Sequence, residues 1–149
     1  MGERPGRHRR SKSSFAIGLM SASYVSAAIV QIALHEFGDI VAETEVMAWS
    51  QLRARVVRIR FTDLSFLDVR LTNRGDYSYH WEHRMVDGGL HRWDNAPHHP
   101  TIGTYPNHLH EGTEDQIVSS PLPFASVEES ARHVLTYLAP TVRANANRA

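Results

Sequence analysis

Cysteine is absent from the 149-residue chain. Its absence excludes a disulfide scaffold, a thiol nucleophile and a zinc site built from thiolates. Any metal site in this protein would therefore need ligands from histidine, aspartate and glutamate side chains. The lack of disulfides also agrees with the reducing conditions of the cytoplasm, and we expect a cytoplasmic protein.

Lysine is almost absent. Lys12 is the only one, so arginine supplies nearly all of the 16 basic side chains. Guanidinium groups bind phosphate and carboxylate through paired hydrogen bonds, and they stack on aromatic rings. An excess of arginine is expected from a GC-rich genome, and equally from contact with nucleic acid or an acidic protein partner. The equal numbers of acidic and basic residues do not distinguish a genomic origin from a functional one.

A long uninterrupted hydrophobic run is also missing. Residues 15–34 follow a basic start, as in a signal peptide, but several polar side chains interrupt them: Ser21, Ser23, Ser26 and Gln31. Tyr24–Phe37 fits the helix of a globular domain better, because apolar side chains such as Ile29 and Ile32 share one stripe. We therefore expect no membrane contact, and we expect residues 1–19 to form a disordered basic extension.

Five segments show the alternation or composition of β-strands: Ile40–Ala48, Leu52–Phe61, Phe66–Leu71, Tyr77–His83 and Leu90–Asp94. Short turns at 73–76 and 87–89 connect the later ones, which predicts an antiparallel meander. In the second segment the apolar side chains change parity at Val56 and Val57, which predicts a β-bulge there. Residues 95–123 are rich in Pro, Gly and His and are expected to be mostly loop.

A C-terminal helix is clearly marked. Ser126 and Glu129 form a capping box ahead of an apolar stripe, and Pro140 is expected to end the helix. The sequence therefore predicts a two-layer α+β fold, in which an antiparallel sheet of about five strands is flanked by an N-terminal and a C-terminal helix. This single domain would span residues 20–140, and residues 141–149 would form a flexible tail.

Histidine is concentrated in one segment. Seven of the ten histidines lie between His80 and His110. As a strand, Tyr77–His83 would place Tyr79 and Trp81 on one face and His80 on the other. Titratable groups crowded in one place mark functional sites more often than not. The stretch from Tyr77 to His110 is therefore the expected functional surface.

These residue types suit phosphodiester cleavage without a metal ion. One imidazole would take a proton from a ribose 2′-hydroxyl, and another would protonate the leaving oxygen, because the pKa of histidine lies near neutral pH. The predicted catalytic residues are His98, His99, His80 and Asp94. The predicted substrate-binding residues are Arg92, Asn95, Tyr79, Trp81, Trp93, His108 and His110. In this hypothesis Arg92 (or Arg70) contacts phosphate, Asp94 orients a histidine, and the aromatic rings stack on a base.

The same residues also suit a metal site, a structural role or a docking face. A divalent metal ion could be bound by His98, His99, His108 and His110. Their spacing matches no strong motif such as HExxH, so we expect no cofactor. In a purely structural role, the histidines would bond to backbone carbonyls and the Trp and Tyr side chains would belong to the core. Finally, a protein partner could dock without any catalysis on an exposed aromatic face made of Tyr79, Trp81 and Trp93. Whether the protein is an enzyme is left open at this point.

Three segments together resemble the signature of the TumE-type toxin family of prokaryotic toxin–antitoxin systems: Tyr77–Trp81 (YSYHW), Arg92–Pro100 (RWDNAPHHP) and Tyr105–His110 (YPNHLH). The nine central residues match the family pattern as they stand. The last segment departs from it, with tyrosine, asparagine and leucine where the family has phenylalanine, histidine and lysine: Tyr105, Asn107 and Leu109. The resemblance extends from Met20 to about Leu138.

The resemblance implies a toxin that is neutralised by a cognate antitoxin, in this family usually a small helix-turn-helix protein. Cleavage of RNA by the clustered histidines does not follow from the resemblance. It is a hypothesis from the residue types, supported by analogy with other toxins of this kind. RNA is therefore the second expected partner.

Overall fold

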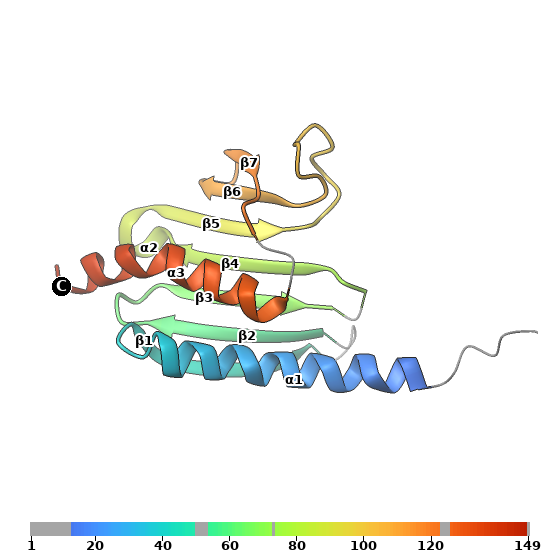
Figure 1. The fold of residues 1–149 in the computed structure, drawn as a ribbon. Coiled ribbons are helices and arrows are strands. Elements are labelled where there is room, and N and C mark those ends of the chain that lie inside the picture. Colours follow the sequence, from blue (N-terminus) through green and yellow to red (C-terminus); the bar gives the residue numbers. More distant parts are fainter. Residues whose placement is uncertain (1–12, 50–53, 73, 123–125, 149) are drawn as a thin grey trace, which may run out of the picture.

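The computed structural model describes residues 13–49, 54–72, 74–122 and 126–148. Among them, seven strands form one antiparallel sheet in sequence order (Figure 1). The strands are β1 (Val41–Trp49), β2 (Ala54–Phe61), β3 (Phe66–Leu71), β4 (Tyr77–His83), β5 (Gly89–Asp94), β6 (His108–Gly112) and β7 (Ile117–Ser119). The helices are α1 (Ser13–Glu36), α2 (Arg84–Asp87) and α3 (Val127–Ala146).

The two long helices lie on one face of the sheet, so the predicted α+β architecture with a helix at each end is confirmed (Figure 1). Their buried side chains, such as Ile29 of α1 and Leu135 of α3, share one hydrophobic core with Ile59, Val69 and Trp81 of the sheet. Burying one face of an antiparallel sheet under two amphipathic helices is the expected way to cover it. The opposite face carries mostly polar side chains, with a few apolar ones among them such as Val56, Phe66 and Leu90.

The sheet has two more strands than the sequence predicts. Both β6 and β7 fall inside residues 95–123, for which the composition predicts mostly loop. The strand signal is weak because β7 has three residues and β6 reads His-Leu-His-Glu-Gly, with Leu109 as its single apolar side chain. Pairing with β5 stabilises β6 in spite of that composition, and it carries two histidines into the sheet.

The predicted β-bulge at Val56 and Val57 is wrong. Strand β2 pairs with both neighbours without interruption at these residues, and the irregularity in register lies in β1, between Val41 and Glu43. Val57 and its neighbour Val56 are both buried, but only Val57 belongs to the hydrophobic core cluster under the helices. The parity of the apolar residues changes because Val56 is buried on the face away from the helices and Val57 on the face toward them, and no extra residue is inserted.

Both long helices extend further than the sequence predicts. Helix α1 begins at Ser13, within the segment expected to be disordered, while residues 1–12 lie outside the described part. Helix α3 begins at the predicted Ser126 cap but runs through Pro140 to Ala146, so the predicted flexible tail is wrong. Pro140 is exposed, and the buried Val142 holds the last turns against the core in spite of the backbone hydrogen bond that proline cannot donate. None of the helices in the described ranges is long and apolar enough to cross a membrane.

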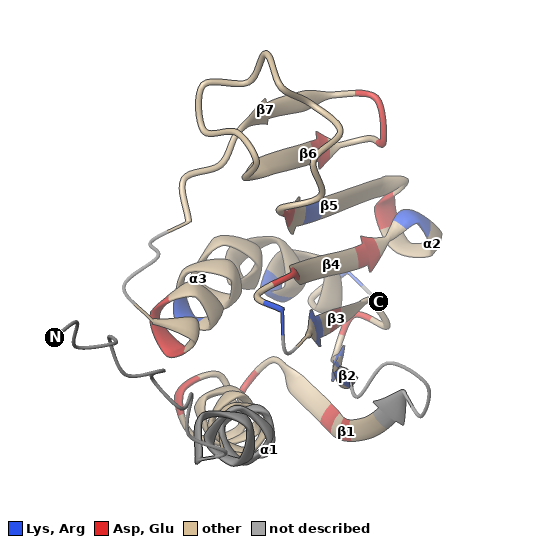
Figure 2. Ribbon diagram, turned by 90° about the vertical axis from the view of Figure 1, so that its right-hand side faces the viewer, with Lys and Arg blue, Asp and Glu red and all other residues tan. Residues whose placement is uncertain are grey.

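Figure 2 shows α1 and α3 on one side of the sheet. The functional groups lie on the other face, which points away from these helices. Directly paired residues of antiparallel strands share a face. The pairing therefore produces two rows across β3, β4, β5 and β6, the first consisting of Arg70, Ser78, Asp94 and His108, and the second of Asp68, His80, Arg92 and His110. We call this surface the polar face.

Candidate functional site

A pocket of about 710 Å³ lies at the end of the polar face, bordered by the loop that follows β5. This volume is within the range of sites for small organic molecules or a nucleotide. Its lining includes most of the residues predicted from the sequence: Arg92, Asp94, Asn95, His98, His99, His108 and His110. Residues 95–99 form one wall, and strands β5 and β6 supply the floor.

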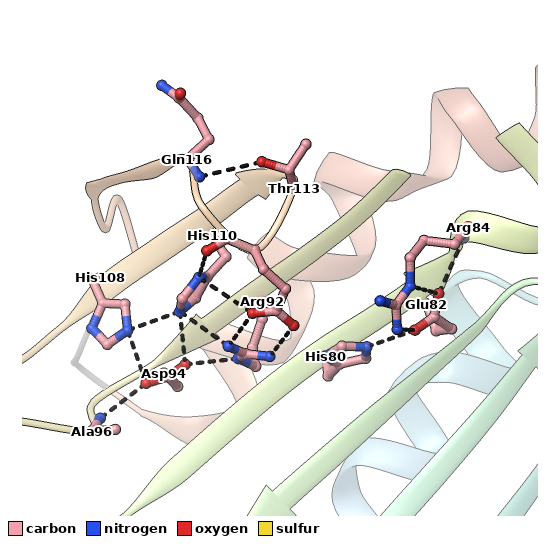
Figure 3. Close-up of polar contacts among 11 residues, drawn as sticks. His80, Glu82, Arg84, Arg92, Asp94, Ala96, His108, His110, Thr113 and Gln116 are labelled. Carbon is pink, nitrogen blue, oxygen red and sulfur yellow. Dashed lines mark hydrogen bonds and ion pairs between the residues drawn. The ribbon is translucent and has the colours of Figure 1, made fainter. Parts of the chain in front are cut away.

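Asp94 is the centre of the hydrogen-bond network at the floor (Figure 3). Its Oδ1 accepts a hydrogen bond from the Ala96 backbone N–H at 3.0 Å, and its Oδ2 accepts one from Arg92 Nε at 3.0 Å. Nε2 of His108 lies 3.1 Å from Oδ1. The carboxylate is buried, so these donors take the place of water around its charge.

His108 and His110 lie two residues apart on β6 and point the same way. Each ring is fixed by a backbone carbonyl, because Nδ1 of His108 lies 3.0 Å from the Pro106 oxygen and Nδ1 of His110 lies 2.8 Å from the Glu114 oxygen. A carbonyl only accepts, so each Nδ1 carries the proton. The two Nε2 atoms are consequently turned toward each other, 3.2 Å apart.

The partners of the two Nε2 atoms differ. His108 faces a carboxylate oxygen of Asp94, which accepts, whereas His110 faces Nη2 of Arg92 at 3.2 Å, which donates. Nε2 of His108 therefore donates, whereas Nε2 of His110 accepts. The pKa of His110 is lowered, first by burial and also by the nearby Arg92 and His108 charges, which agrees with a neutral ring.

Arg92 is held between two carboxylates. Its terminal nitrogens donate to Glu114 at 2.9 and 2.8 Å, in addition to its bond with Asp94. The Glu114 side chain is 46% exposed, so it can turn into solvent and release the two terminal nitrogens. A phosphate could then take the place of the Glu114 carboxylate, since both groups accept paired hydrogen bonds from a guanidinium.

Only one of the two adjacent loop histidines joins the cluster. The His99 ring centroid lies 4.7 Å from that of His108 and 5.7 Å from that of His110, both in edge-to-face geometry. His98 is exposed at the pocket rim. We call His99, His108 and His110 the histidine cluster.

Two further predicted residues take other positions. Asn95 accepts from the Tyr77 N–H at 3.0 Å and donates to the Gly75 carbonyl at 2.9 Å, so it braces the turn between β3 and β4. His80 is the partner of Arg92 across the strands but does not line the pocket, and its Nε2 pairs with Glu82 at 3.1 Å. The pKa of Glu82 falls to about 2, chiefly because of the Arg84 hydrogen bonds.

The predicted base-stacking and docking roles of the aromatic side chains are wrong, and the alternative in which they belong to the core is confirmed. Tyr79, Trp81 and Trp93 are 2%, 1% and 0% exposed and belong to the core beneath the helices. They cannot stack on a base or form an exposed docking face in this fold. The alternation predicted for β4 is confirmed, but its aromatic face is the face that the helices cover.

Another wall of the pocket, at the end of β3 and the start of β4, is only weakly indicated by the sequence. Arg70, Tyr77 and Ser78 line the pocket there, and the sequence predicts only Arg70 among them, as an alternative phosphate contact. The Tyr77 hydroxyl donates to Asn107 Oδ1 at 2.8 Å, and burial raises the pKa of Tyr77 to about 12. Parity indicates that Ser78 shares the face of His80, but the pairing of Ser78 with Asp94 depends on the register, which the sequence does not show.

Two more histidines form a separate cluster at the corner between β4 and β5, on the helix side of the sheet. His83 lies between the Asp87 carboxylate, which faces its Nδ1, and His91, 2.9 Å from its Nε2. Asn145 of α3 donates to the other oxygen of Asp87 at 3.0 Å. The His83 ring stacks on Trp81 with centroids 3.7 Å apart. This cluster joins the end of α3 to the sheet and accounts for part of the histidine content in structural terms.

The corner cluster should make stability depend on pH. The pKa of His91 is lowered to about 4, chiefly by burial and also by the neighbouring His83. In the unfolded chain that pKa is about 6.5, so between these values the unfolded state binds a proton that the folded state does not. The free energy of unfolding should therefore fall as the pH drops from about 6.5 to about 4.

Urea unfolding at pH 7 and pH 5 measures this effect. Because the His91 ring is only half-buried, its share of the loss should be on the order of 1 kcal/mol. The variant His91→Gln should lose correspondingly less stability over the same interval. An equal loss in the two proteins would contradict the assignment to His91.

A protein-family model matches most of the chain. The family model described as "Toxin TumE" matches residues 31–142 of the chain, a range that contains the whole sheet, the pocket and most of α3. Searches among curated proteins and among solved structures find no match.

Proposed function

Because the chain belongs to the TumE toxin family, we propose that it inhibits growth by cleaving RNA in this pocket, without a metal ion, until a cognate antitoxin of the helix-turn-helix type neutralises it. One observation supports RNA cleavage above the rest. An arginine, a buried carboxylate and three histidines, all from residues 92–110, line one open pocket. Such a set can bind a phosphodiester and move protons around it.

The proposed reaction is transfer of the phosphoryl group to the neighbouring ribose oxygen. A base takes the proton of the 2′-hydroxyl, the 2′-oxygen bonds to phosphorus, and the bond to the 5′-oxygen breaks as that oxygen receives a proton from an acid. The products are a 2′,3′-cyclic phosphate and a 5′-hydroxyl. Arg92 would stabilise the charge that develops on the phosphoryl oxygens once Glu114 has turned away.

The hydrogen bonds suggest which groups move the protons. The Nε2 atoms of His108 and His110 are 3.2 Å apart, so the two rings act as one unit that passes a proton beside Asp94. This pair is the proposed acid. His99 is half-buried at the edge of the cluster and is the proposed base. His99 therefore remains a proposed proton-transfer residue, as the sequence predicts. His108 and His110 replace His98 as the second proton-transfer group of this proposal.

Induced expression of the full chain in a bacterial host tests this function. Growth and total RNA are followed together, and we expect growth arrest with RNA fragments that end in 2′,3′-cyclic phosphate. Coexpression of a helix-turn-helix protein encoded beside the toxin should restore growth. The variant His35→Gln, on the exposed side of α1, serves as the matched histidine control and should still cleave. Growth arrest with intact RNA would refute RNA cleavage, and the protein would then be a toxin with another target.

A further inference from the structure

We propose that the histidine cluster also binds a divalent transition-metal ion of the zinc type, with His99, His108 and His110 as ligands and Asp94 beside them. One ring nitrogen of each histidine lies within 4.8 Å of the other two. The site is part of the pocket floor, so an ion could reach it from solvent.

The spacing of the two β6 histidines already fits a shared ion. Two ligand atoms at about 2.1 Å from a tetrahedral zinc ion lie about 3.4 Å apart. The Nε2 atoms of His108 and His110 are 3.2 Å apart, and Oδ1 of Asp94 lies 3.1 Å from the first of them. His99 is only half-buried, so it is the ligand that can move inward to complete the set.

The outer hydrogen bonds are also those of a metal site. Histidine ligands usually donate their second ring N–H to a carbonyl or carboxylate, which fixes the tautomer and aims the free lone pair at the ion. The carbonyls of Pro106 and Glu114 do this for His108 and His110. Both rings are buried, so little rotational freedom is lost when an ion binds.

The charges around the cluster permit a divalent ion. Arg92 is unfavourable, because its Nη2 lies 3.2 Å from the lone pair of His110. However, Asp94 and Glu114 carry two negative charges against that one positive charge, so the surroundings are net negative when the histidines are neutral. If Glu114 turned outward and the Arg92 guanidinium bonded to it moved with it, Nε2 of His110 would be free to bind the ion. Imidazole ligands select zinc, nickel, cobalt or copper over magnesium and calcium, which prefer oxygen.

An ion at this position would compete with the proposed chemistry. It would occupy the ring nitrogens of His99, His108 and His110, which the metal-free reaction needs for proton transfer. We therefore expect zinc to inhibit RNA cleavage. This consequence rests on the proposed function, whereas binding of the ion does not.

The test uses the purified full-length protein, freed of metal by chelator. Calorimetric titration with Zn²⁺ should show one ion per chain, and Co²⁺ should give the visible absorption of a tetrahedral site. Loss of a ligand should weaken Zn²⁺ binding by at least about 100-fold. Replacing a residue that only hydrogen-bonds to a ligand already costs up to about 100-fold. His99→Ala is the main variant because its ring is not part of the core, and His98→Ala from the same loop is the matched control.

Each outcome decides a separate point. Absence of binding tighter than about 100 μM, or equal binding by His99→Ala and His98→Ala, would overturn the site. Zinc binding without RNA cleavage under any condition would uphold the site and refute the proposed function. Cleavage that is lost with chelator and restored by zinc would uphold the site and refute the metal-free reaction. RNA cleavage that continues with zinc bound would refute the expected inhibition by zinc.

Discussion

Replacing His99 by alanine should reduce RNA cleavage by about 10²–10⁴-fold, the range of a lost proton-transfer group, while the neighbouring His98→Ala should cost less than about tenfold. The two residues are adjacent in the same loop, but only the His99 ring contacts His108 and His110. The measurement is kcat/KM on a short single-stranded RNA, with the thermal unfolding of each variant as a check on folding.

A pH profile separates a base from a residue that only supports the loop. For the wild type, kcat/KM should rise and then fall with pH, since one group must be neutral and another protonated. The variant His99→Ala should lose the rising limb, because the proposed base is missing. A profile of unchanged shape at reduced height would show that His99 positions other groups. Equal losses in His98→Ala and His99→Ala would assign the effect to the loop and not to one imidazole.

The sequence could predict which residue types meet, but not which of two adjacent histidines enters the site. His108 and His110 could be assigned to one face because residues two apart in a strand point the same way. His98 and His99 lie in a loop, where spacing does not determine direction. The contact of His99 with the β6 histidines depends on how the loop folds over β5, which is a tertiary effect.

Tertiary packing, which the sequence does not show, also explains why the sequence predicts neither β6 nor β7 and why it assigns the aromatic residues to the binding surface. A polar strand such as β6 is stabilised by its neighbour and not by its own composition, so alternation alone does not reveal it. The alternation of β4 is as predicted, yet the sequence does not say which face the helices cover. Large aromatic side chains bury the most apolar area, and this favours the side of the core for Tyr79 and Trp81.

Truncation of Trp93 should lower the free energy of unfolding by about 3–5 kcal/mol, the usual cost of replacing a buried tryptophan by alanine. The side chain is fully buried and packs edge-on against Tyr137 of α3, with centroids 5.3 Å apart. Urea unfolding of Trp93→Ala measures this loss. A folded variant of normal stability that loses only partner binding would restore the hypothesis of an exposed aromatic docking face.

Phenylalanine at the two buried tryptophans separates packing from hydrogen bonding. Trp81 donates its Nε1–H to Ser65 Oγ at 3.1 Å, whereas among the described residues the Trp93 Nε1–H finds no acceptor. Both substitutions remove a similar volume, but Trp81→Phe also removes a satisfied donor, and Trp93→Phe removes one whose burial costs free energy. Trp81→Phe should therefore be less stable than Trp93→Phe by about 1–3 kcal/mol. Equal losses would mean that the two N–H groups are equally well satisfied in solution, and the buried donor of Trp93 would then have a water as its partner.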